Sequence, residues 1–487
     1  MQRPGMIALA TSRIAADRVN LVGNCPVIDY GARLAVPSVF AFAKNYIFFH
    51  ATRTCAELRR ENPRMLLMPK GRHVLLQVDS FMQGGMENVV IDLALSLQDT
   101  GFKVTIGNLG RSGYAIKAAR ERGLNVESFP NGLSEEDYVG WLRREKVAIV
   151  NAHYSIFGAE SCNRAGIPFI ETIHNAYVWL DSQSIEKYRE ADRYISSYIC
   201  VSNTAALYAD VVLGLDVSKM RVIPNGIDVD SINAAQFSRN RSALRMQWGV
   251  DESAPVYLNV ASILPAKAQL ALVKAFELVR DQRPGALLVL LGGAMDESYR
   301  DTVVDAIQHA NLQESVIVAG HREDVNKYYH AADVFVLPSY WEGWSLSLGE
   351  AMANGLPCVV TDVGSAYEFE GHPRVEVVRP PFGDVTALRF DNIASHVYKE
   401  DASFIKDLAE AMLRAAKVAR GQIDVDFAAR LDRRIAYVRY AEIFGGGRTD
   451  GHRFALPNSG PNEPTGHGMW RGGAPNAGQS MGRAHAG

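Results

Sequence analysis

Two glutamates that stand eight residues apart carry the strongest chemical signal in this sequence. A buried strand is predicted to end at Leu337 and a helix to begin near Ser345, which places Glu342 on the loop between them and Glu350 inside the helix. Backbone N–H groups at the start of a helix have no partner within the helix and bind anions. The residues at this predicted anion site are Gly343, Ser345, Leu346 and Ser347.

Carboxylates on both sides of an anion site can hold the hydroxyl groups of a sugar and of a ribose that flank a diphosphate. Glu342 and Glu350 are therefore candidates for binding a nucleotide sugar. The alternative for each residue taken alone is structural: Glu342 would be solvated, and Glu350 would form an ion pair on its helix.

A lysine provides the second candidate. Lys267 follows the predicted strand Val256–Val260 and opens a predicted helix. At such a position a lysine can direct a compact positive charge at a phosphate group. The alternative is a solvated lysine at a helix start.

Glycines and histidines follow strands in the first half of the chain. Gly84 and Gly85 lie between the predicted strand His73–Asp79 and a helix, where they allow the backbone to approach a ligand closely or simply form a tight turn. His153 follows the predicted strand Val147–Val150, and His174 follows Phe169–Ile173. Isolated histidines at such places are often only structural hydrogen-bonding groups.

These candidates depend on a regular alternation of strands and helices. The predicted strands are His73–Asp79, Val104–Ile106, Val126–Phe129, Val147–Val150, Phe169–Ile173, Tyr198–Val201, Val256–Val260, Leu287–Leu291, Val316–Val318, Val334–Leu337 and Cys358–Thr361. Alternation of this kind predicts parallel sheets that are covered by helices on both faces. Ligands bind at the carboxyl ends of the strands in such sheets, which is where the candidates lie.

The alternation is interrupted once, after Pro224-Asn225-Gly226, and the polar stretch that continues to about Arg245 is a candidate linker. We therefore expect an extension (1–71), two Rossmann-like domains (72–240 and 241–425), a closing helix (426–445) and a tail (446–487). The last helices are predicted at Phe404–Arg420 and Phe427–Phe444. The tail has few aliphatic residues to offset its ordering entropy, which predicts disorder.

Composition narrows the class of protein. A length of 487 residues favours two domains, and the net charge of -3 provides no basic field for nucleic acid. The five cysteines are scattered, without a CxxC pair, which favours a reducing compartment over a disulfide framework or a zinc site. The apolar run Val36–Phe49 contains Lys44 and is shorter than the roughly 20 residues that span a bilayer. We expect a cytoplasmic protein, and peripheral contact with the inner face of the membrane through this run stays open.

The segment from Pro338 to Pro357 resembles the signature of retaining glycosyltransferases of family four, also called glycosyl transferases group one. Glu342 and Glu350 form the E-x7-E motif within Pro-Ser-x-x-Glu-Gly-x-x-x-x-x-x-Glu-Ala-Met-Ala-x-Gly-x-Pro, and the resemblance extends over about residues 73 to 445. It implies the GT-B fold, an α/β architecture with a cleft between two facing doubly wound domains. The first domain would hold the acceptor, and the second would hold the nucleotide sugar donor.

The resemblance also implies residue roles in the second domain. Lys267 matches a lysine that holds the donor diphosphate together with an arginine five residues earlier. This chain has Ser262 at the arginine position, so half of the usual cationic pair is missing, and Ala268 stands where glycine is common. Arg322 fits a loop that borders the nucleotide base.

In the first domain, Gly84-Gly85 followed by Glu87 matches a loop that lies against the donor phosphates and the acceptor. His153 matches a position beside the donor sugar and acceptor. The segment Pro224–Asp228 matches an element near the domain junction, which we interpret as structural.

The expected reaction transfers a hexose from a nucleoside diphosphate sugar to a glycan or lipid-linked acceptor, with retention of the anomeric configuration, which the resemblance implies. Lys267 and the helix N–H groups would stabilise the negative charge on the departing diphosphate. We expect no metal ion and no cofactor besides the nucleotide sugar. We favour attack on the same face through an oxocarbenium-like state, because no nucleophile for a double displacement is evident.

Two other classes remain as alternatives. A GT-B epimerase or phosphorylase would share the architecture, although a phosphorylase needs a lysine for pyridoxal phosphate and usually a longer chain. A protein that binds a nucleotide sugar without chemistry is favoured only by Ser262. The sequence specifies neither the sugar, the base and the acceptor nor the oligomeric state.

Overall fold

The computed structural model describes residues 71–446, except residues 83, 233, 370, 400 and 422–430. Three sequence-based predictions fall outside these residues: the N-terminal extension, the membrane-contact segment within it, and the C-terminal tail after Gly446. Cys25 and Cys55 also lie outside them. Both sheets described below belong to one compact unit.

The first sheet has seven parallel strands in the order β3-β2-β1-β4-β5-β6-β7. Its elements, with the helices between them, are β1 (His73–Val78), α4 (Gly85–Asp99), β2 (Lys103–Asn108), α5 (Tyr114–Glu121), β3 (Asn125–Ser128), α6 (Glu135–Arg144), β4 (Val147–His153), α7 (Ala159–Arg164), β5 (Phe169–Ile173), α8 (Ser182–Asp192), β6 (Ser197–Cys200), α9 (Asn203–Val211) and β7 (Met220–Val222). Alternate residues of β1 face opposite sides: Val74 and Leu76 belong to the buried cluster with α4 and α5, and Leu75 to the one with α6 and α9.

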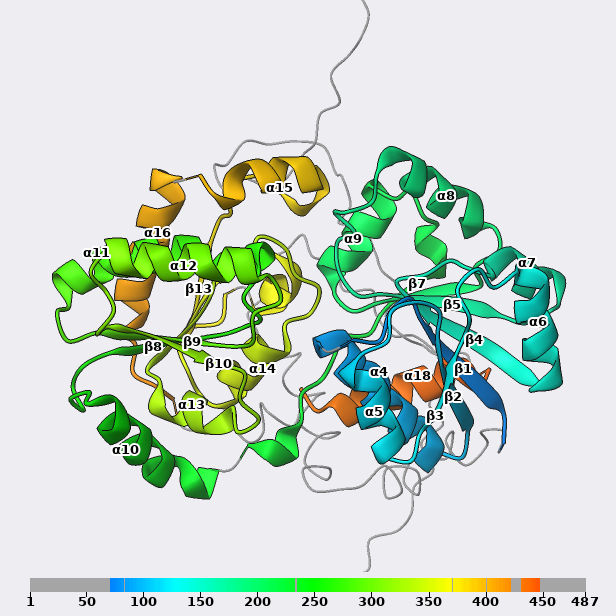
Figure 1. Cartoon of the computed structure of the whole chain (residues 1–487), viewed down its shortest axis with the longest axis horizontal. Helices are drawn as coiled ribbons and strands as arrows, with labels where there is room; N and C mark the ends of the chain where they lie inside the picture. The colour runs from blue at the N-terminus through cyan, green and yellow to red at the C-terminus, as the bar shows by residue number, and fades with distance from the viewer. Residues whose placement is uncertain are drawn as a thin grey trace, which may run out of the picture. The chain divides into compact units, whose positions relative to one another are not determined.

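The second sheet has six parallel strands in the order β10-β9-β8-β11-β12-β13. Its elements are α10 (Phe237–Trp248), β8 (Val256–Val260), α11 (Gln269–Gln282), β9 (Leu287–Leu291), α12 (Glu297–His309), β10 (Val316–Gly320), α13 (Asn326–Ala331), β11 (Val334–Leu337), α14 (Leu346–Ala353), β12 (Cys358–Thr361), β13 (Val375–Val378), α15 (Phe390–Val397) and α16 (Ala402–Ala415). Figure 1 shows α11 and α12 on one side of this sheet and α10 and α13 on the other. Both faces are thus buried, which explains the continuous apolar strand Leu287–Leu291.

The strand order reverses direction once in each sheet. In the first sheet this switch point lies between β1 and β4, and in the second between β8 and β11. Open α/β sheets bind ligands in the crevice at such points, beyond the carboxyl ends of the strands. The register places Val78, the last residue of β1, beside His153, the last residue of β4.

The last helix returns to the first sheet. Residues Ala436, Tyr437, Tyr440 and Phe444 of α18 (Arg433–Phe444) are buried in the cluster that contains α4 and β1. Figure 1 shows α18, in orange, beside α4. The ion pair from Arg433 Nη1 to Asp92 Oδ2, at 2.6 Å, joins these two helices. The last described helix therefore packs on the domain that contains the first described strand.

Several sequence-based boundaries were wrong. Residues 237–245, predicted as linker, belong to α10, which packs against α13. The helix predicted to reach Arg420 ends at Ala415, and the final helix begins at Arg433 rather than Phe427, residues 422–430 being outside the described part. The short strands β7 and β13 were missed. Each has only three or four residues, with a burial pattern too short for a periodicity signal.

Among the described residues, no helix combines the length and the apolar character needed to cross a bilayer.

Candidate active site

The loops after the four strands that border the switch points carry most of the predicted site residues. Gly84 and Gly85 follow β1, and His153 ends β4, three residues later than the predicted end of this strand at Val150. Lys267 follows β8, and Glu342 follows β11. The topology of the two sheets thus explains why residues from distant parts of the chain become candidates for one site.

Lys267 and Glu342 form an ion pair. The Lys267 Nζ lies 2.6 Å from Oε1 of Glu342, and the Ser339 hydroxyl donates to the same oxygen at 2.7 Å. The side chain of Glu342 is only 12% exposed, so it is not the solvated rim residue of the alternative interpretation. Because an ammonium group has three N–H donors, Lys267 keeps two for a ligand while it holds Glu342.

The backbone around Lys267 explains one departure from the family pattern. Lys267 ends a 3-10 helix (Pro265–Lys267), and Ala268 joins this helix to α11 with a φ of 53°. That left-handed conformation is the one in which glycine is unstrained, which accounts for the glycine expected there. The carbonyl oxygen of Ser262 accepts a hydrogen bond from Gln269 Nε2 at 2.9 Å. The recorded contacts of Lys267 and Glu342 within the described residues include no arginine.

The start of α14 carries the backbone N–H groups that were predicted to bind an anion. Ser345 is the N-cap, and its hydroxyl accepts from the Leu348 N–H. The Ser345 N–H itself donates to the hydroxyl of Ser365 at 3.0 Å, so this amide has a partner within the protein. Leu346 and Ser347 lie in the first turn, where backbone N–H groups have no partner within the helix.

Gly343 is tightly enclosed. A Cβ atom at this position would lie 1.5 Å from the carbonyl oxygen of His174, so no other residue fits without moving the backbone. The loop that carries Glu342 therefore touches the loop after β5. A Cβ at Gly85 would lie 3.8 Å from the Leu346 side chain, so the glycine loop after β1 also reaches the start of α14.

Glu350 lies inside the site rather than on a solvated helix face. Its Oε2 accepts a hydrogen bond from the Tyr329 hydroxyl at 2.8 Å. Burial raises the pKa of Glu350 to about 7, and the Tyr329 hydrogen bond opposes this rise. No ion pair of Glu350 is recorded within the described residues, which removes the surface ion pair as an explanation of this residue.

The two histidines form a buried pair. Nδ1 of His153 lies 2.7 Å from Nε2 of His174, and the rings are stacked with their centroids 5.0 Å apart. Desolvation lowers the pKa of His153 well below its usual value and that of His174 to about 3, so both rings are neutral at neutral pH. The other nitrogen of His153, Nε2, is buried and has no recorded hydrogen-bond partner within the described residues.

The charges of two carboxylates act on Tyr154. The pKa of Tyr154 is raised mainly by burial, and further by the negative charges of Glu87 and Glu342. Glu87 accepts from the Met82 N–H at 3.2 Å and so fixes the loop that contains Gly84. Tyr154 has a φ of 61°, and its hydroxyl accepts from Asn175 Nδ2 at 2.9 Å.

Arg322 lies on the exposed loop after β10. Its Nε donates to the Tyr328 hydroxyl at 3.2 Å, and its Nη1 donates to the His321 carbonyl. The recorded contacts do not join it to Lys267 or Glu342, so it stands apart from the ion pair.

The sequence analysis gave no role to Tyr329, Ser339 or Ser365. Ser339 lies two residues after the end of the strand β11, a position that could have marked it as a candidate. Tyr329 and Ser365 reach the site only because α13 and the segment after β12 pack against α14, and no local pattern marks them.

Among the described residues, no group of three or more His, Cys, Asp or Glu side chains is arranged to hold a metal ion. Independence from metal stays a prediction.

Solved structures share this architecture. The Anabaena protein HepE in complex with UDP-glucose superposes with a TM-score of 0.57 and 21% sequence identity, covering 77% of this chain and 99% of that one. WaaG, a glycosyltransferase involved in lipopolysaccharide biosynthesis, gives 0.53 and 17%, covering 77% of this chain and 100% of the other. At these identities the similarity shows the fold, which is that of the GT-B glycosyltransferases.

Sequence comparison supplies the family. The family described as Glycosyltransferase Family 4 matches residues 83–231, and the family described as Glycosyl transferases group 1 matches residues 240–388. The first match falls on the seven-stranded sheet of the GT-B fold, and the second falls on the six-stranded sheet and includes the E-x7-E pair. The chain belongs to the family-four glycosyltransferases.

Two relatives show which proteins this chain is similar to in sequence. UDP-Gal:alpha-D-GlcNAc-diphosphoundecaprenol alpha-1,3-galactosyltransferase from Escherichia coli is 30% identical over 248 residues, which are 47% of this chain and 63% of the relative. The match thus spans less than two thirds of that relative. D-inositol 3-phosphate glycosyltransferase from Kineococcus radiotolerans is 27% identical over 342 residues, 62% of this chain and 78% of the relative.

Proposed function

We propose that this protein transfers a hexose from a nucleoside diphosphate sugar to a glycan or lipid-linked acceptor, with retention of anomeric configuration and without a metal ion. The observation that carries the proposal is the Lys267–Glu342 ion pair beside the start of α14. A cation and free helix N–H groups stabilise a departing diphosphate, and a neighbouring carboxylate binds sugar hydroxyls.

The two members of the ion pair have different roles in the proposed reaction. As the bond from the anomeric carbon to the diphosphate oxygen breaks, negative charge collects on that oxygen. Lys267 and the N–H groups of Leu346 and Ser347 stabilise this charge before the acceptor bond is complete. Glu342 keeps Lys267 in place and accepts hydroxyl groups of the donor sugar, whose ring becomes positively charged in the oxocarbenium-like state.

The remaining residues bind and orient the reactants. Glu350 accepts the ribose hydroxyls, and the buried, unpartnered Nε2 of His153 contacts a hydroxyl of the donor sugar. Because both histidines are neutral, His153 orients the sugar and does not deliver charge. The acceptor hydroxyl attacks the face that the diphosphate leaves, and its proton passes to the leaving phosphate oxygen.

The acceptor class rests on the relatives. One of them, by its name, acts on a sugar diphosphate of undecaprenol and another on D-inositol 3-phosphate. We propose that this protein acts on an acceptor of the first kind or on a glycan.

The test combines donors and acceptors. Purified full-length protein is incubated with UDP-, GDP- and ADP-hexoses, each with GlcNAc-diphosphate-polyprenol, a short glycan or inositol 3-phosphate, and nucleoside diphosphate release is measured. We expect release that depends on an acceptor and a product whose anomeric configuration, by NMR, equals that of the donor. An inverted product would contradict retention.

The same assay separates the alternatives. Conversion of the nucleotide sugar to an isomer without an acceptor would identify an epimerase, and release of sugar phosphate from a glycan with inorganic phosphate would identify a phosphorylase. Binding of a nucleotide sugar without release under any of these conditions would identify a binding protein.

A further inference from the structure

The Glu350 carboxylate is oriented by one recorded hydrogen bond, from the hydroxyl of Tyr329. Within the described residues, Tyr329 is the one recorded hydrogen-bond donor to the Glu350 carboxylate, and the same hydroxyl lies 3.2 Å from the Ser347 carbonyl oxygen. Tyr329 is 1% exposed, so its hydroxyl has no bulk water as an alternative partner. One carboxylate oxygen is thereby fixed, which leaves the other for a ligand.

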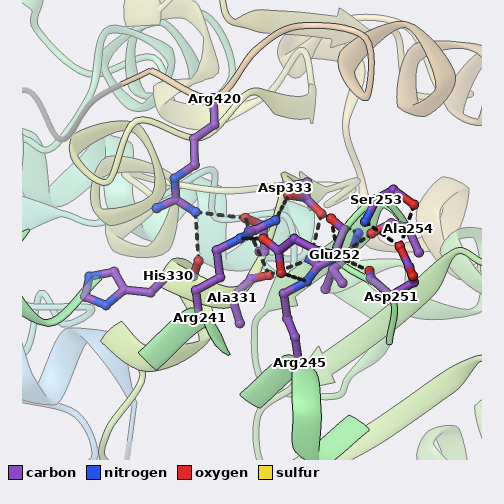
Figure 2. A network of polar contacts seen from close by, with 12 residues as sticks. Arg241, Arg245, Asp251, Glu252, Ser253, Ala254, His330, Ala331, Asp333 and Arg420 are labelled. Carbon is purple, nitrogen blue, oxygen red and sulfur yellow. Dashed lines mark hydrogen bonds and ion pairs between the residues drawn. The ribbon is translucent and has the colours of Figure 1, made fainter. Parts of the chain in front are cut away.

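The helix that carries Tyr329 is held at its end by three arginines. Figure 2 shows Arg241, Arg245 and Arg420 converging on the carbonyl groups at the end of α13. Arg420 donates to the carbonyl oxygens of Tyr329, at 2.6 Å, and of Ala332, at 2.8 Å. These are carbonyl groups that a helix end leaves without a helical partner.

Arg420 also connects the two helices whose side chains meet. Its Nη2 donates to the carbonyl oxygen of Asn354, the C-cap of α14, at 2.9 Å. The planar guanidinium therefore ties the end of α13 to the end of α14, and its fixed fork defines their spacing. Desolvation lowers the pKa of Arg420 to about 9, and the nearby charge of Arg241 acts in the same direction. The Arg420 guanidinium is thus desolvated, and its recorded hydrogen bonds are made to backbone carbonyl groups.

We propose that Tyr329 is a positioning residue for the donor nucleoside: its hydroxyl orients the Glu350 carboxylate toward the ribose hydroxyl groups, on a pair of helices that Arg420 clamps together. The inference rests on the proposed function, in which Glu350 accepts the ribose. It assigns discrimination between ribose and deoxyribose to a residue outside the E-x7-E motif.

The charge state of Glu350 gives the inference a second consequence. Burial and the charge of Asp228 raise the pKa of Glu350, whereas the Tyr329 hydrogen bond and Arg433 lower it. Removing the hydroxyl therefore raises the pKa of Glu350 further, because the charged carboxylate gains more from this donor than the neutral acid does. The neutral form of Glu350, which is the weaker hydrogen-bond acceptor, would then be more populated at neutral pH.

The experiment compares ribonucleotides with deoxyribonucleotides. Among UDP, GDP and ADP, the tightest ligand of the wild type is chosen by calorimetry and compared with its 2′-deoxy and 3′-deoxy forms. The wild type should prefer the ribonucleotide by about 10-fold or more, as expected for a hydrogen bond to a charged group. Tyr329→Phe should lose most of this preference while its affinity for the deoxynucleotides changes little.

Tyr257→Phe is the matched control. It removes a buried hydroxyl of the same domain, whose recorded partner is the Met412 carbonyl, and it should keep the ribose preference. If Tyr329→Phe weakened ribonucleotide and deoxynucleotide binding by the same factor, Tyr329 would have only a structural role and the inference would be overturned. The double variant Tyr329→Phe/Glu350→Gln removes the buried charge as well, and it should show no smaller ribose preference than Glu350→Gln alone.

A pH profile provides the second readout. Affinity for the ribonucleotide should fall as pH decreases through the pKa of Glu350, and Tyr329→Phe should move this fall to higher pH. An unmoved profile would contradict the inference. If the wild type bound none of the nucleoside diphosphates, the proposed function would fail instead, whereas a wild-type ribose preference retained in Tyr329→Phe would refute this inference alone.

Discussion

Replacing Lys267 with alanine should affect the chemical step more than donor binding. Lys267 holds Glu342 at 2.6 Å, and it is the one side-chain cation recorded in contact with Glu342 within the described residues. The family's second cation is absent, because Ser262 occupies its position and contributes only a backbone carbonyl to the recorded hydrogen bonds. No neighbour in this loop replaces the lost charge.

The magnitude follows from two effects. Losing one preorganised donor to developing charge costs about 10²–10³ in rate, which corresponds to about 2.7–4 kcal/mol of barrier. In addition, Glu342 keeps only Ser339 as a recorded side-chain donor and repels the diphosphate. We therefore expect Lys267→Ala to lower kcat by about 10³-fold, the upper end of that range. In a Glu342→Gln background the repulsion is absent, so the same change should cost less, and a double-mutant cycle measures the difference.

The assay separates turnover from binding. Initial rates of nucleoside diphosphate release give kcat and KM, and calorimetry gives the Kd of the nucleoside diphosphate, which should weaken less than kcat. Lys406→Ala is the control, since Lys406 forms only an exposed pair with Glu410 on α16 and should leave kcat unchanged. If Lys267→Ala keeps more than about a tenth of the wild-type kcat, the diphosphate is held elsewhere and the site assignment is wrong.

Four further predictions concern the charge of the site and the stability of the fold. Ser262→Arg should restore the missing cation and tighten nucleoside diphosphate binding in calorimetry; unchanged affinity would mean that another group already fills this place. Activity should be complete in excess chelator, and a loss that manganese or magnesium restores would refute the metal-free proposal. The folded-state pKa of His174 is lowered to about 3, so between that value and its usual 6.5 the unfolded chain binds the additional proton. The free energy of unfolding should therefore fall as pH decreases below about 6.5, less steeply in His174→Gln, and equal slopes in chemical denaturation would contradict this. Arg245→Met should destabilise the fold by about 3–5 kcal/mol, because Arg245 is buried against Asp333 and three carbonyls of the following loop; the exposed Arg239→Met serves as its control in the same denaturation experiment.

The sequence alone determined the class of fold and the residues at the ends of the strands. Alternating apolar strands and helices are local patterns, and β8, β9, β11 and β12 were predicted with the bounds that the structure has. The Glu342–Glu350 spacing is likewise a local pattern, because a loop and a helix start place both residues within one short segment. Such patterns can be recognised in the sequence because each reflects which residues are buried within one short segment of the chain.

The tertiary structure decided which groups meet. The contact between Lys267 and Glu342 joins residues 75 positions apart, and that between His153 and His174 depends on the pairing of β4 with β5. Neither contact leaves a trace in local composition. Polar residues 237–245 resemble a linker in sequence. The partners of Arg241 and Arg245 are Asp333, the end of α13 and the loop that contains Glu252, and they become neighbours only in the folded chain. A buried polar residue looks like a solvent-exposed one in sequence, and only the position of its partner in space distinguishes the two.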